Sequence, residues 1–228
     1  MDEALQECAA FIDAQTVPTI HKLIKQRDAK YLVDRQKTAI HESTVAQKPI
    51  TNVQAPPGCG KTYILADTVE MITVQYPTKR TLILTPTNLA ARGIGTETIK
   101  ARHRYGRAPK DYKNLDVLLL ESRHAALSIE ENETAVIKQR PENTEILENM
   151  RLRSHLQRIL EQADAIPNPA DIPKVFKGWH EDSRQKIENY LATKEADVAA
   201  RVDEELILGY CMAWRTIRVI VATFVSQS

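Results

Sequence analysis

The residues best suited to chemistry lie in one short stretch, Ala-Pro-Pro-Gly-Cys-Gly-Lys-Thr at residues 55–62. Gly58 and Gly60 allow the backbone to curl so that successive N–H groups face the oxygens of a phosphate. Lys61 supplies a positive charge for the β- and γ-phosphates, and the Thr62 hydroxyl can ligate Mg²⁺. We therefore take Lys61 and Thr62 as the catalytic candidates. The nucleotide-binding candidates in this stretch are Pro57, Gly58, Cys59, Gly60, Lys61 and Thr62.

Elements on both sides of this stretch are expected to hold it in place. Residues 50–54 form a candidate strand before it, and Ile64 and Thr68 repeat after it at helical spacing. A helix that starts near Lys61 points the positive end of its dipole at the phosphates. A second strand at residues 81–85 follows at a distance that suits a right-handed βαβ crossover. This order of strand, glycine-rich turn and helix predicts a nucleoside-triphosphate site rather than a chance Gly-Lys-Thr turn.

Four motifs, which follow one another along the chain in the order that the family has, resemble those of superfamily 1 helicases of the up-frameshift (nonsense-mediated decay) type. Residues 55–62 look like their motif I, and residues 85–91, Thr-Pro-Thr-Asn-Leu-Ala-Ala, look like their motif Ia. Residues 32–40 resemble their Q motif, and residues 219–223 resemble the strand in their motif Ic region. Ala55 departs from the usual pattern, because a glycine is expected there.

The resemblance implies roles for further residues. Gln36 would read the adenine base, and the motif Ia residues Pro86, Thr87 and Asn88 would contact the nucleic-acid backbone. It also implies ATP and Mg²⁺ as cofactors and single-stranded RNA or DNA as the partner. The implied activity is that of an ATP-dependent nucleic-acid helicase.

The same resemblance implies an α/β fold, the RecA-like parallel sheet of P-loop NTPases with a long helical insertion. Apolar residues such as Leu152, Leu156 and Ile159 lie on one helical face of the insertion, which favours packing in a core. The insertion is also a candidate surface for a protein partner. The predicted segments are an N-terminal helical segment with the Q-like motif (1–41), a P-loop βαβ core (42–100), the helical insertion (101–216), and a final core strand with the C-terminus (217–228).

The residues for hydrolysis are incomplete in this sequence. Hydrolysis needs a carboxylate pair at the end of an apolar strand, and an arginine that stabilises the developing charge. The family carries these beyond the strand at residues 219–223, and the Asp203-Glu204 pair lies in a helical pattern instead. We expect this chain to bind MgATP, and full helicase activity to need a longer chain with a second RecA-like domain.

A basic segment follows the motif Ia-like residues. Residues 100–113 contain six positive charges, one negative charge and two tyrosines. Arg102 and Arg104 could follow a phosphate backbone while the tyrosines stack on bases. An ordinary charged loop would have the same composition, so the sequence leaves both interpretations open.

Composition sets limits on the other classes of function. The chain has 228 residues, a net charge of +1, 43% hydrophobic and 27% charged residues. This is a globular composition that excludes binding through bulk positive charge. The wide spacing of Cys8, Cys59 and Cys211 argues against a disulfide framework or a zinc site. Without a signal peptide or an apolar run of membrane-spanning length, we expect an intracellular protein of the cytoplasm or nucleus with no membrane partner.

Two other functions remain open at this stage. A small-molecule P-loop kinase would be complete at this length, but it needs an arginine-rich lid, for which residues 100–113 are the candidate. A non-catalytic, degenerate helicase fragment would instead use its helical arms to bind a protein partner.

Overall fold

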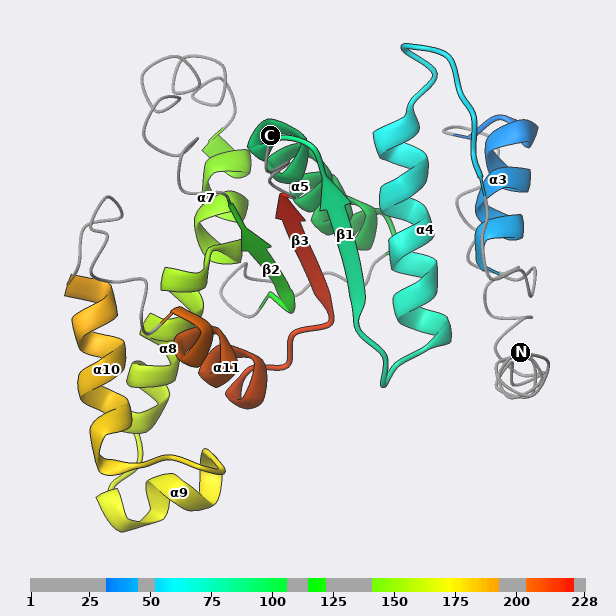
Figure 1. Cartoon of the computed structure of the whole chain (residues 1–228). Coiled ribbons are helices and arrows are strands. Elements are labelled where there is room, and N and C mark those ends of the chain that lie inside the picture. The colour runs from blue at the N-terminus through cyan, green and yellow to red at the C-terminus, as the bar shows by residue number, and fades with distance from the viewer. Residues whose placement is uncertain (1–31, 45–51, 106–114, 122–140, 193–203, 224–228) are drawn as a thin grey trace, which may run out of the picture. The chain divides into compact units, whose positions relative to one another are not determined.

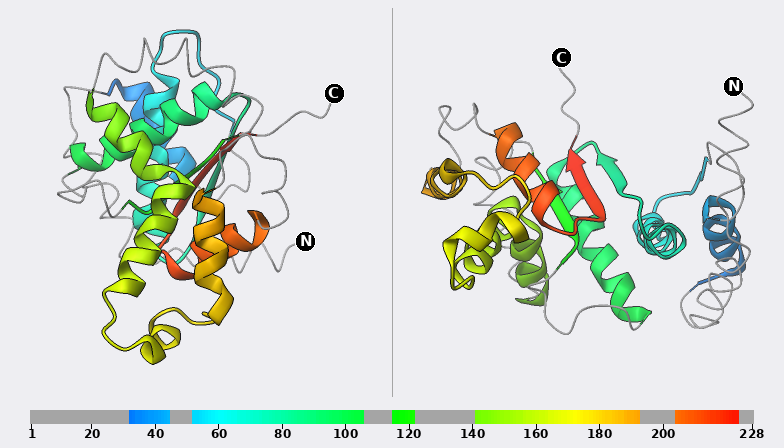
Figure 2. Two further views of the ribbon diagram at one scale, coloured as in Figure 1. Left: turned by 90° about the vertical axis from the view of Figure 1, so that its left-hand side faces the viewer. Right: turned by 90° about the horizontal axis from the view of Figure 1, so that it is seen from below.

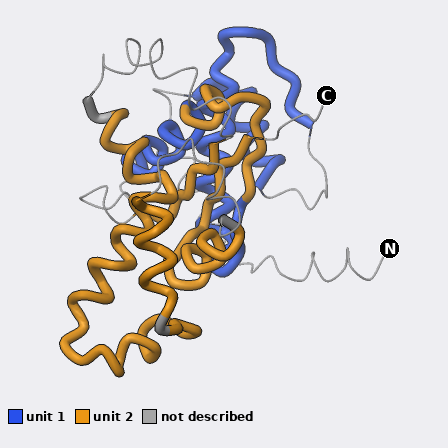
Figure 3. The backbone as a smooth tube through the Cα atoms, turned by 60° about the vertical axis from the view of Figure 1, so that its left-hand side comes forward, with its two compact units in different colours: residues 1–81, 93–110 blue, residues 82–92, 111–228 orange. Residues whose placement is uncertain are grey.

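The computed structural model describes residues 32–44, 52–105, 115–121, 141–192 and 204–223 (Figure 1, Figure 2). The chain divides into two compact units, each with its own apolar core. Unit 1 comprises residues 1–81 and 93–110, and unit 2 comprises residues 82–92 and 111–228 (Figure 3).

Unit 1 is built on two helices, α3 (Asp34–Thr44) and α4 (Lys61–Gln75), which pack against each other. It also contains the part of helix α5 (Asn88–Arg104) from Gly93 onward. Burial of each large apolar side chain contributes about 1.5–3 kcal/mol to folding. The buried residues of this core are Leu32, Ile40, Ile64 and Met71.

Unit 2 contains a three-stranded sheet in the order β1-β3-β2 (Figure 1). The strands are β1 (Thr81–Thr85), β2 (Val117–Leu120) and β3 (Val219–Thr223). Strands β2 and β3 pair in parallel, and the arrows in Figure 1 show β1 running in the same direction. The carboxyl ends of all three strands therefore meet at one edge of the sheet, where open α/β sheets place their ligands.

The helices of unit 2 cover this sheet and form a second layer of apolar contacts. Helix α8 packs against both α10 and α11, which lie beside it in the views of Figure 2. The elements are α7 (Pro141–Met150), α8 (Leu152–Asp164), the 3₁₀ turn η2 (Pro169–Asp171), α9 (Ile172–Val175), α10 (Glu181–Ala192) and α11 (Glu204–Trp214). Their shared core includes Leu118, Leu156, Ile159, Phe176, Ile187, Ile207 and Cys211.

Two aromatic residues of unit 2, Trp179 and Trp214, belong to this packing. Their ring centroids are 5.1 Å apart, and Trp214 stacks on Tyr210 at 4.4 Å. The Trp214 indole N–H donates to the carbonyl of Lys177. Both tryptophans therefore act as packing residues in the helical layer.

His155 on α8 is a buried polar residue in the same unit. Its Nε2 lies 3.1 Å from the Val117 carbonyl and donates to it, while its Nδ1 has no hydrogen-bond partner. Burial disfavours the charged imidazolium and lowers the pKa of His155 to about 4. The core is therefore built around a neutral histidine.

The predicted α/β class is confirmed, with a parallel sheet and strands at the predicted positions 81–85 and 219–223. The apolar face predicted from Leu152, Leu156 and Ile159 is also confirmed, since all three are buried on α8. Among the described residues, no helix is long and apolar enough to cross a membrane.

Two local expectations differ from the structure. Strand β2 lies within residues 101–216, which the sequence assigned to helices, because a four-residue apolar run shows no period that separates strand from helix. In the strand predicted at residues 50–54, the described residues 52–54 have no regular secondary structure, and Val53 is exposed. A β-branched residue adopts a strand only when neighbours pack on it. Residues 50 and 51 lie outside the described residues.

Candidate functional site

The glycine-rich stretch of unit 1 has the backbone conformation that its sequence predicts. Gly58 and Gly60 lie in the left-handed region, with φ of +76° and +81°. Helix α4 begins directly after Gly60, an N-cap residue that has no side chain to accept from the first N–H groups of the helix. A residue with Cβ would be strained at both glycines. The loop therefore presents backbone donors at a helix start, as an anion site requires.

Lys61 and Thr62 stand at the first turn of α4, where both are exposed. The Lys61 ammonium donates to the carbonyls of Pro56 and Ala55, at 2.8 and 3.2 Å. The Lys61 ammonium is thus held by backbone carbonyls of the loop, close to where a phosphate would bind. Pro57 is exposed and Cys59, a free thiol, is half-buried in the same loop.

The residues of this loop fit a magnesium-bound triphosphate by the chemistry of their donors. Mg²⁺ prefers oxygen ligands and keeps several waters beside substrate phosphates, so a protein hydroxyl can be one of its ligands. Thr62 supplies such a hydroxyl at the solvent-exposed end of α4. Within the described residues, no three His, Cys, Asp or Glu side chains converge to hold a metal by themselves.

Gln36 lies against the loop although it precedes its contact residue, Cys59, by 23 residues. Its amide nitrogen donates to the Cys59 carbonyl at 3.0 Å, and its Oε1 accepts from the Val33 N–H at 3.0 Å. A Cβ on Gly60 would come within 3.4 Å of the Gln36 amide nitrogen. The structure therefore brings Gln36 together with the phosphate loop, and its contact with adenine stays a prediction.

Arg102 and Arg104, predicted to contact nucleic acid, have acidic partners within unit 1. The Arg102 Nε donates to Glu70 at 2.9 Å, and both side chains are almost completely buried. Arg104 pairs with Asp67 at 3.3 Å and with Glu97, and its guanidinium lies 4.0 Å from the Tyr63 ring centroid. These contacts tie the end of α5 to α4. The nucleic-acid role of the two arginines stays a prediction, and residues 106–113 of the basic segment lie outside the described residues.

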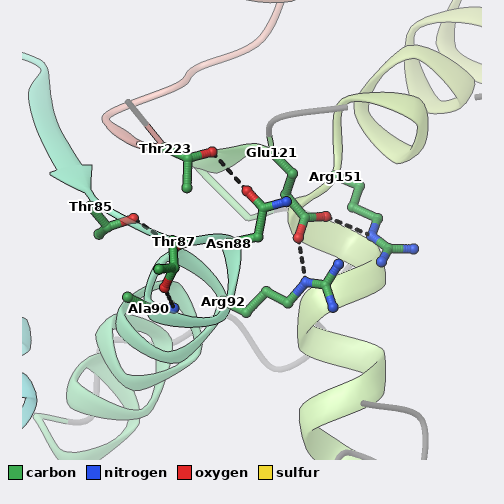
Figure 4. Close-up of polar contacts among 8 residues, drawn as sticks. All are labelled: Thr85, Thr87, Asn88, Ala90, Arg92, Glu121, Arg151 and Thr223. Atoms are coloured by element: carbon green, nitrogen blue, oxygen red, sulfur yellow. Dashed lines mark hydrogen bonds and ion pairs between the residues drawn. The ribbon is translucent and has the colours of Figure 1, made fainter. Parts of the chain in front are cut away.

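The predicted nucleic-acid residues of motif Ia lie in unit 2, at the carboxyl end of β1. Pro86 and Thr87 are exposed, and the Thr87 hydroxyl accepts from the Ala90 N–H at 3.1 Å at the start of α5. Asn88 is 3% exposed, and its Oδ1 accepts from the Thr223 hydroxyl at 2.8 Å (Figure 4). Thr87 therefore faces solvent, whereas Asn88 holds α5 to the end of β3.

A second polar group at the same edge was not anticipated from the sequence. Glu121 follows the last residue of β2 and pairs with Arg92 of α5 and with Arg151, which precedes α8 (Figure 4). The sequence held one signal for this group, because an acidic residue directly after the apolar run at 117–120 marks a strand end. Arg92 lies one helical turn after Asn88, but nothing in its local sequence indicates its partner.

Comparison with known proteins identifies the family. A family model described as an AAA domain matches residues 36–207, about three-quarters of the chain. The match begins at Gln36 and includes both the phosphate loop and the motif Ia-like residues. Neither the curated proteins nor the solved structures contain a match to this chain.

Proposed function

The chain belongs to the AAA domain family of P-loop NTPases, and from this premise we propose that it is an ATP-binding, helicase-like protein that acts on single-stranded RNA or DNA. Nucleotide binding follows from the family, and hydrolysis of a nucleoside triphosphate is its general activity. The observation that carries the proposal is the loop itself. Its two left-handed glycines are followed directly by Lys61 and Thr62 at the exposed start of α4.

Each loop residue has a distinct part in nucleotide binding. The amides between Gly58 and Thr62 donate to phosphate oxygens, and their geometry is supported by the left-handed glycines. Lys61 exchanges its two carbonyl contacts for the β- and γ-phosphates, where charge develops during phosphoryl transfer. Thr62 would hold Mg²⁺, which neutralises phosphate charge when it is bound.

Gln36 contributes to the same site through the backbone of the loop. Its side chain is held at both ends, by the Val33 N–H and the Cys59 carbonyl. A hydrogen bond between an adenine and Gln36 would therefore act directly on the loop that holds the phosphates, through the contact of Gln36 with the Cys59 carbonyl. The adenine contact that the resemblance implies would thus be coupled to the binding of the phosphates.

The nucleic-acid part of the proposal rests on the Thr-Pro-Thr-Asn-Leu-Ala-Ala resemblance at residues 85–91. Two features of unit 2 support it. Pro86 and Thr87 are exposed at the carboxyl edge of the sheet, where ligands bind in open α/β folds. Asn88, buried against Thr223, orients this turn. Pro86 and Thr87 are thus the proposed contacts, and Asn88 positions them.

The experiment is binding of MgATP and of single-stranded RNA or DNA by the chain, each measured for the unmodified chain and for Lys61→Ala. Binding of both ligands by the unmodified chain, with MgATP binding weakened by the substitution, is the expected result. Transfer of the γ-phosphate to a nucleoside monophosphate, with no response to nucleic acid, would favour the small-molecule kinase instead. ATP binding without nucleic-acid binding, combined with stoichiometric capture of a defined protein, would favour the non-catalytic helicase fragment.

A further inference from the structure

The Gln36 side chain joins two pieces of backbone in unit 1. Gln36 is the third residue of α3, and its Oε1 accepts from the N–H of Val33, which directly precedes that helix, at 3.0 Å. Its Nε2 donates to the Cys59 carbonyl of the phosphate loop, also at 3.0 Å. One amide group therefore connects the start of α3 to the loop.

The contact with Val33 fixes the position of the Gln36 side chain. A glutamine at the third helical position that accepts from the N–H of the residue before the helix forms half of a capping box. The Val33 carbonyl in turn accepts from the N–H groups of Gln36 and Lys37, at 2.9 and 3.1 Å. Helix α3 itself packs against α4, which begins at the loop. The Gln36 amide nitrogen thus approaches the loop from a fixed point of the unit.

The contact with Cys59 determines how one peptide group of the loop is turned. The Cys59 carbonyl and the Gly60 N–H belong to the same peptide, which is trans and planar, so they point to opposite sides of the chain. Because the carbonyl points at Gln36, the Gly60 N–H points away from Gln36. In a turn with left-handed residues such as Gly58 and Gly60, successive N–H groups converge on an anion. Gln36 therefore stands behind the loop, on the side opposite to the Gly60 N–H.

The glycine makes this orientation depend on a partner. Glycine populates positive and negative φ about equally, so the backbone at Gly60 does not by itself select the observed φ of +81°. A reversed peptide would turn the Cys59 carbonyl toward the phosphates, where its partial negative charge would repel them. The Gln36 amide lies in contact with this peptide, because a Cβ on Gly60 would come within 3.4 Å of its nitrogen. The hydrogen bond from Gln36 favours the orientation that suits an anion.

We propose that Gln36 is a positioning residue for the phosphates of the ligand, and that it acts whatever base the ligand carries. Its donation to the Cys59 carbonyl holds the Gly60 N–H toward the triphosphate. The inference rests on the proposed function, in which the loop binds MgATP, and it makes the triphosphate group itself the feature that this residue helps to recognise. An amide has a second N–H and a second lone pair, so a contact with adenine would add to this effect without replacing it.

The test is a calorimetric titration with MgATP and with magnesium tripolyphosphate, which carries the phosphates but no base. Gln36→Met keeps the length and the neutrality of the side chain and removes its amide. We expect the affinity for both ligands to fall about three- to tenfold, the effect of one lost neutral hydrogen bond. A loss of affinity for MgATP alone would overturn the inference, because Gln36 would then act through the base.

Gln36→Glu separates the contact with the loop from the cap of α3. A glutamate at this position still accepts from the Val33 N–H, but its carboxylate cannot donate to the Cys59 carbonyl. It should therefore also weaken both ligands. Its negative charge repels phosphate as well, and salt screens that repulsion, so the loss relative to the unmodified chain should persist at high salt. Equal affinities of the two chains at high salt would overturn the inference, and this variant decides the question if Gln36→Met does not fold.

Thr38→Val is the matched control. Thr38 lies on the same helix, and its hydroxyl donates to the Asp34 carbonyl at 3.0 Å, so the substitution removes a side-chain hydrogen bond that lies within α3. The affinity for both ligands should stay unchanged in this variant. Equal losses in Thr38→Val and Gln36→Met would overturn the inference, because they would show a general loosening of α3.

The outcomes separate the inference from the function on which it rests. Binding of MgATP but not of tripolyphosphate by the unmodified chain would overturn the inference alone, since affinity would then depend on the base. Failure of the unmodified chain to bind MgATP would overturn the nucleotide part of the proposed function, and the inference with it.

Discussion

The phosphate loop of unit 1 and the carboxyl edge of unit 2 are built in opposite ways. The loop is one run of residues, 55–62, whose function depends on backbone conformation at two glycines. The edge combines side chains from four separate places in the chain, including Thr87, Glu121, Arg151 and Thr223. A site formed by the backbone of one short segment can be predicted from the sequence, whereas a site formed by side chains from distant segments cannot.

The two units also differ in how acidic partners are arranged around their arginines. In unit 1, Arg104 has two carboxylate partners and Arg102 is buried with Glu70, so these charges are matched by acids. In unit 2, Arg92 and Arg151 both pair with the same carboxylate, that of Glu121. Positive charge in the sequence therefore indicates a binding site only after its acidic partners have been counted.

The largest expected effect tests the structural role of the ion pairs in unit 1. Arg102→Met leaves the Glu70 carboxylate buried without its charged partner, which typically costs about 3–5 kcal/mol of stability. Hydrogen exchange of the α4 amides should report the loss. The double variant with Glu70→Leu should recover most of it, because a buried ion pair and an apolar pair of similar size are close in stability.

If Arg102→Met folded with unchanged exchange rates on α4, the buried pair would contribute nothing, and the contrast between the two units would fail.

A smaller effect is expected from pH in unit 2. The lowered pKa of His155, about 4, means that the unfolded chain takes up a proton that the folded chain refuses. The free energy of unfolding should therefore be highest above pH 6.5 and fall by roughly 1.4 kcal/mol per pH unit, about 3 kcal/mol in total, as the pH drops toward 4. Urea unfolding followed by tryptophan fluorescence reports this unit, because both tryptophans of the chain lie in it.

His155→Gln is the control for this pH dependence. It can still donate to the Val117 carbonyl but cannot take up a proton in this range. The slope between pH 6.5 and 4 should flatten in this variant, and an unchanged slope would assign the acid sensitivity to other groups.

The smallest of the three effects on stability tests the backbone of the loop. Gly60→Ala forces a Cβ into a left-handed conformation near the Gln36 amide, at a cost of about 1–2 kcal/mol. Thermal unfolding should show this loss, and MgATP binding should weaken with it. Gly93→Ala is the matched control, because its Cβ would meet nothing within 4 Å in a helix, where alanine is favoured by up to about 1 kcal/mol.

A stable Gly60→Ala variant with full nucleotide affinity would show that the left-handed turn is not what forms the site.

The same contrast explains which features the sequence could predict. The sequence predicts those features whose chemistry or apolar pattern is local. They are the loop at residues 55–62 and the strands at residues 81–85 and 219–223. Strand β2 was missed because four apolar residues have no distinguishing period. The partners of Gln36 and Arg102 could not be predicted either, because each contact joins two residues that are far apart in the sequence and that only the fold brings together.

The most direct test of the central claim is a calorimetric titration of the chain with MgATP, compared between Lys61→Ala and Lys79→Ala. Lys79 is an exposed lysine in the turn after α4, so its substitution removes the same charge from the same unit. We expect saturable binding that Lys61→Ala weakens by about 10–100-fold, because a charge-assisted contact is lost, and that Lys79→Ala leaves unchanged. Equal MgATP affinity in the unmodified chain and in Lys61→Ala would contradict the claim that the phosphate loop binds MgATP through Lys61.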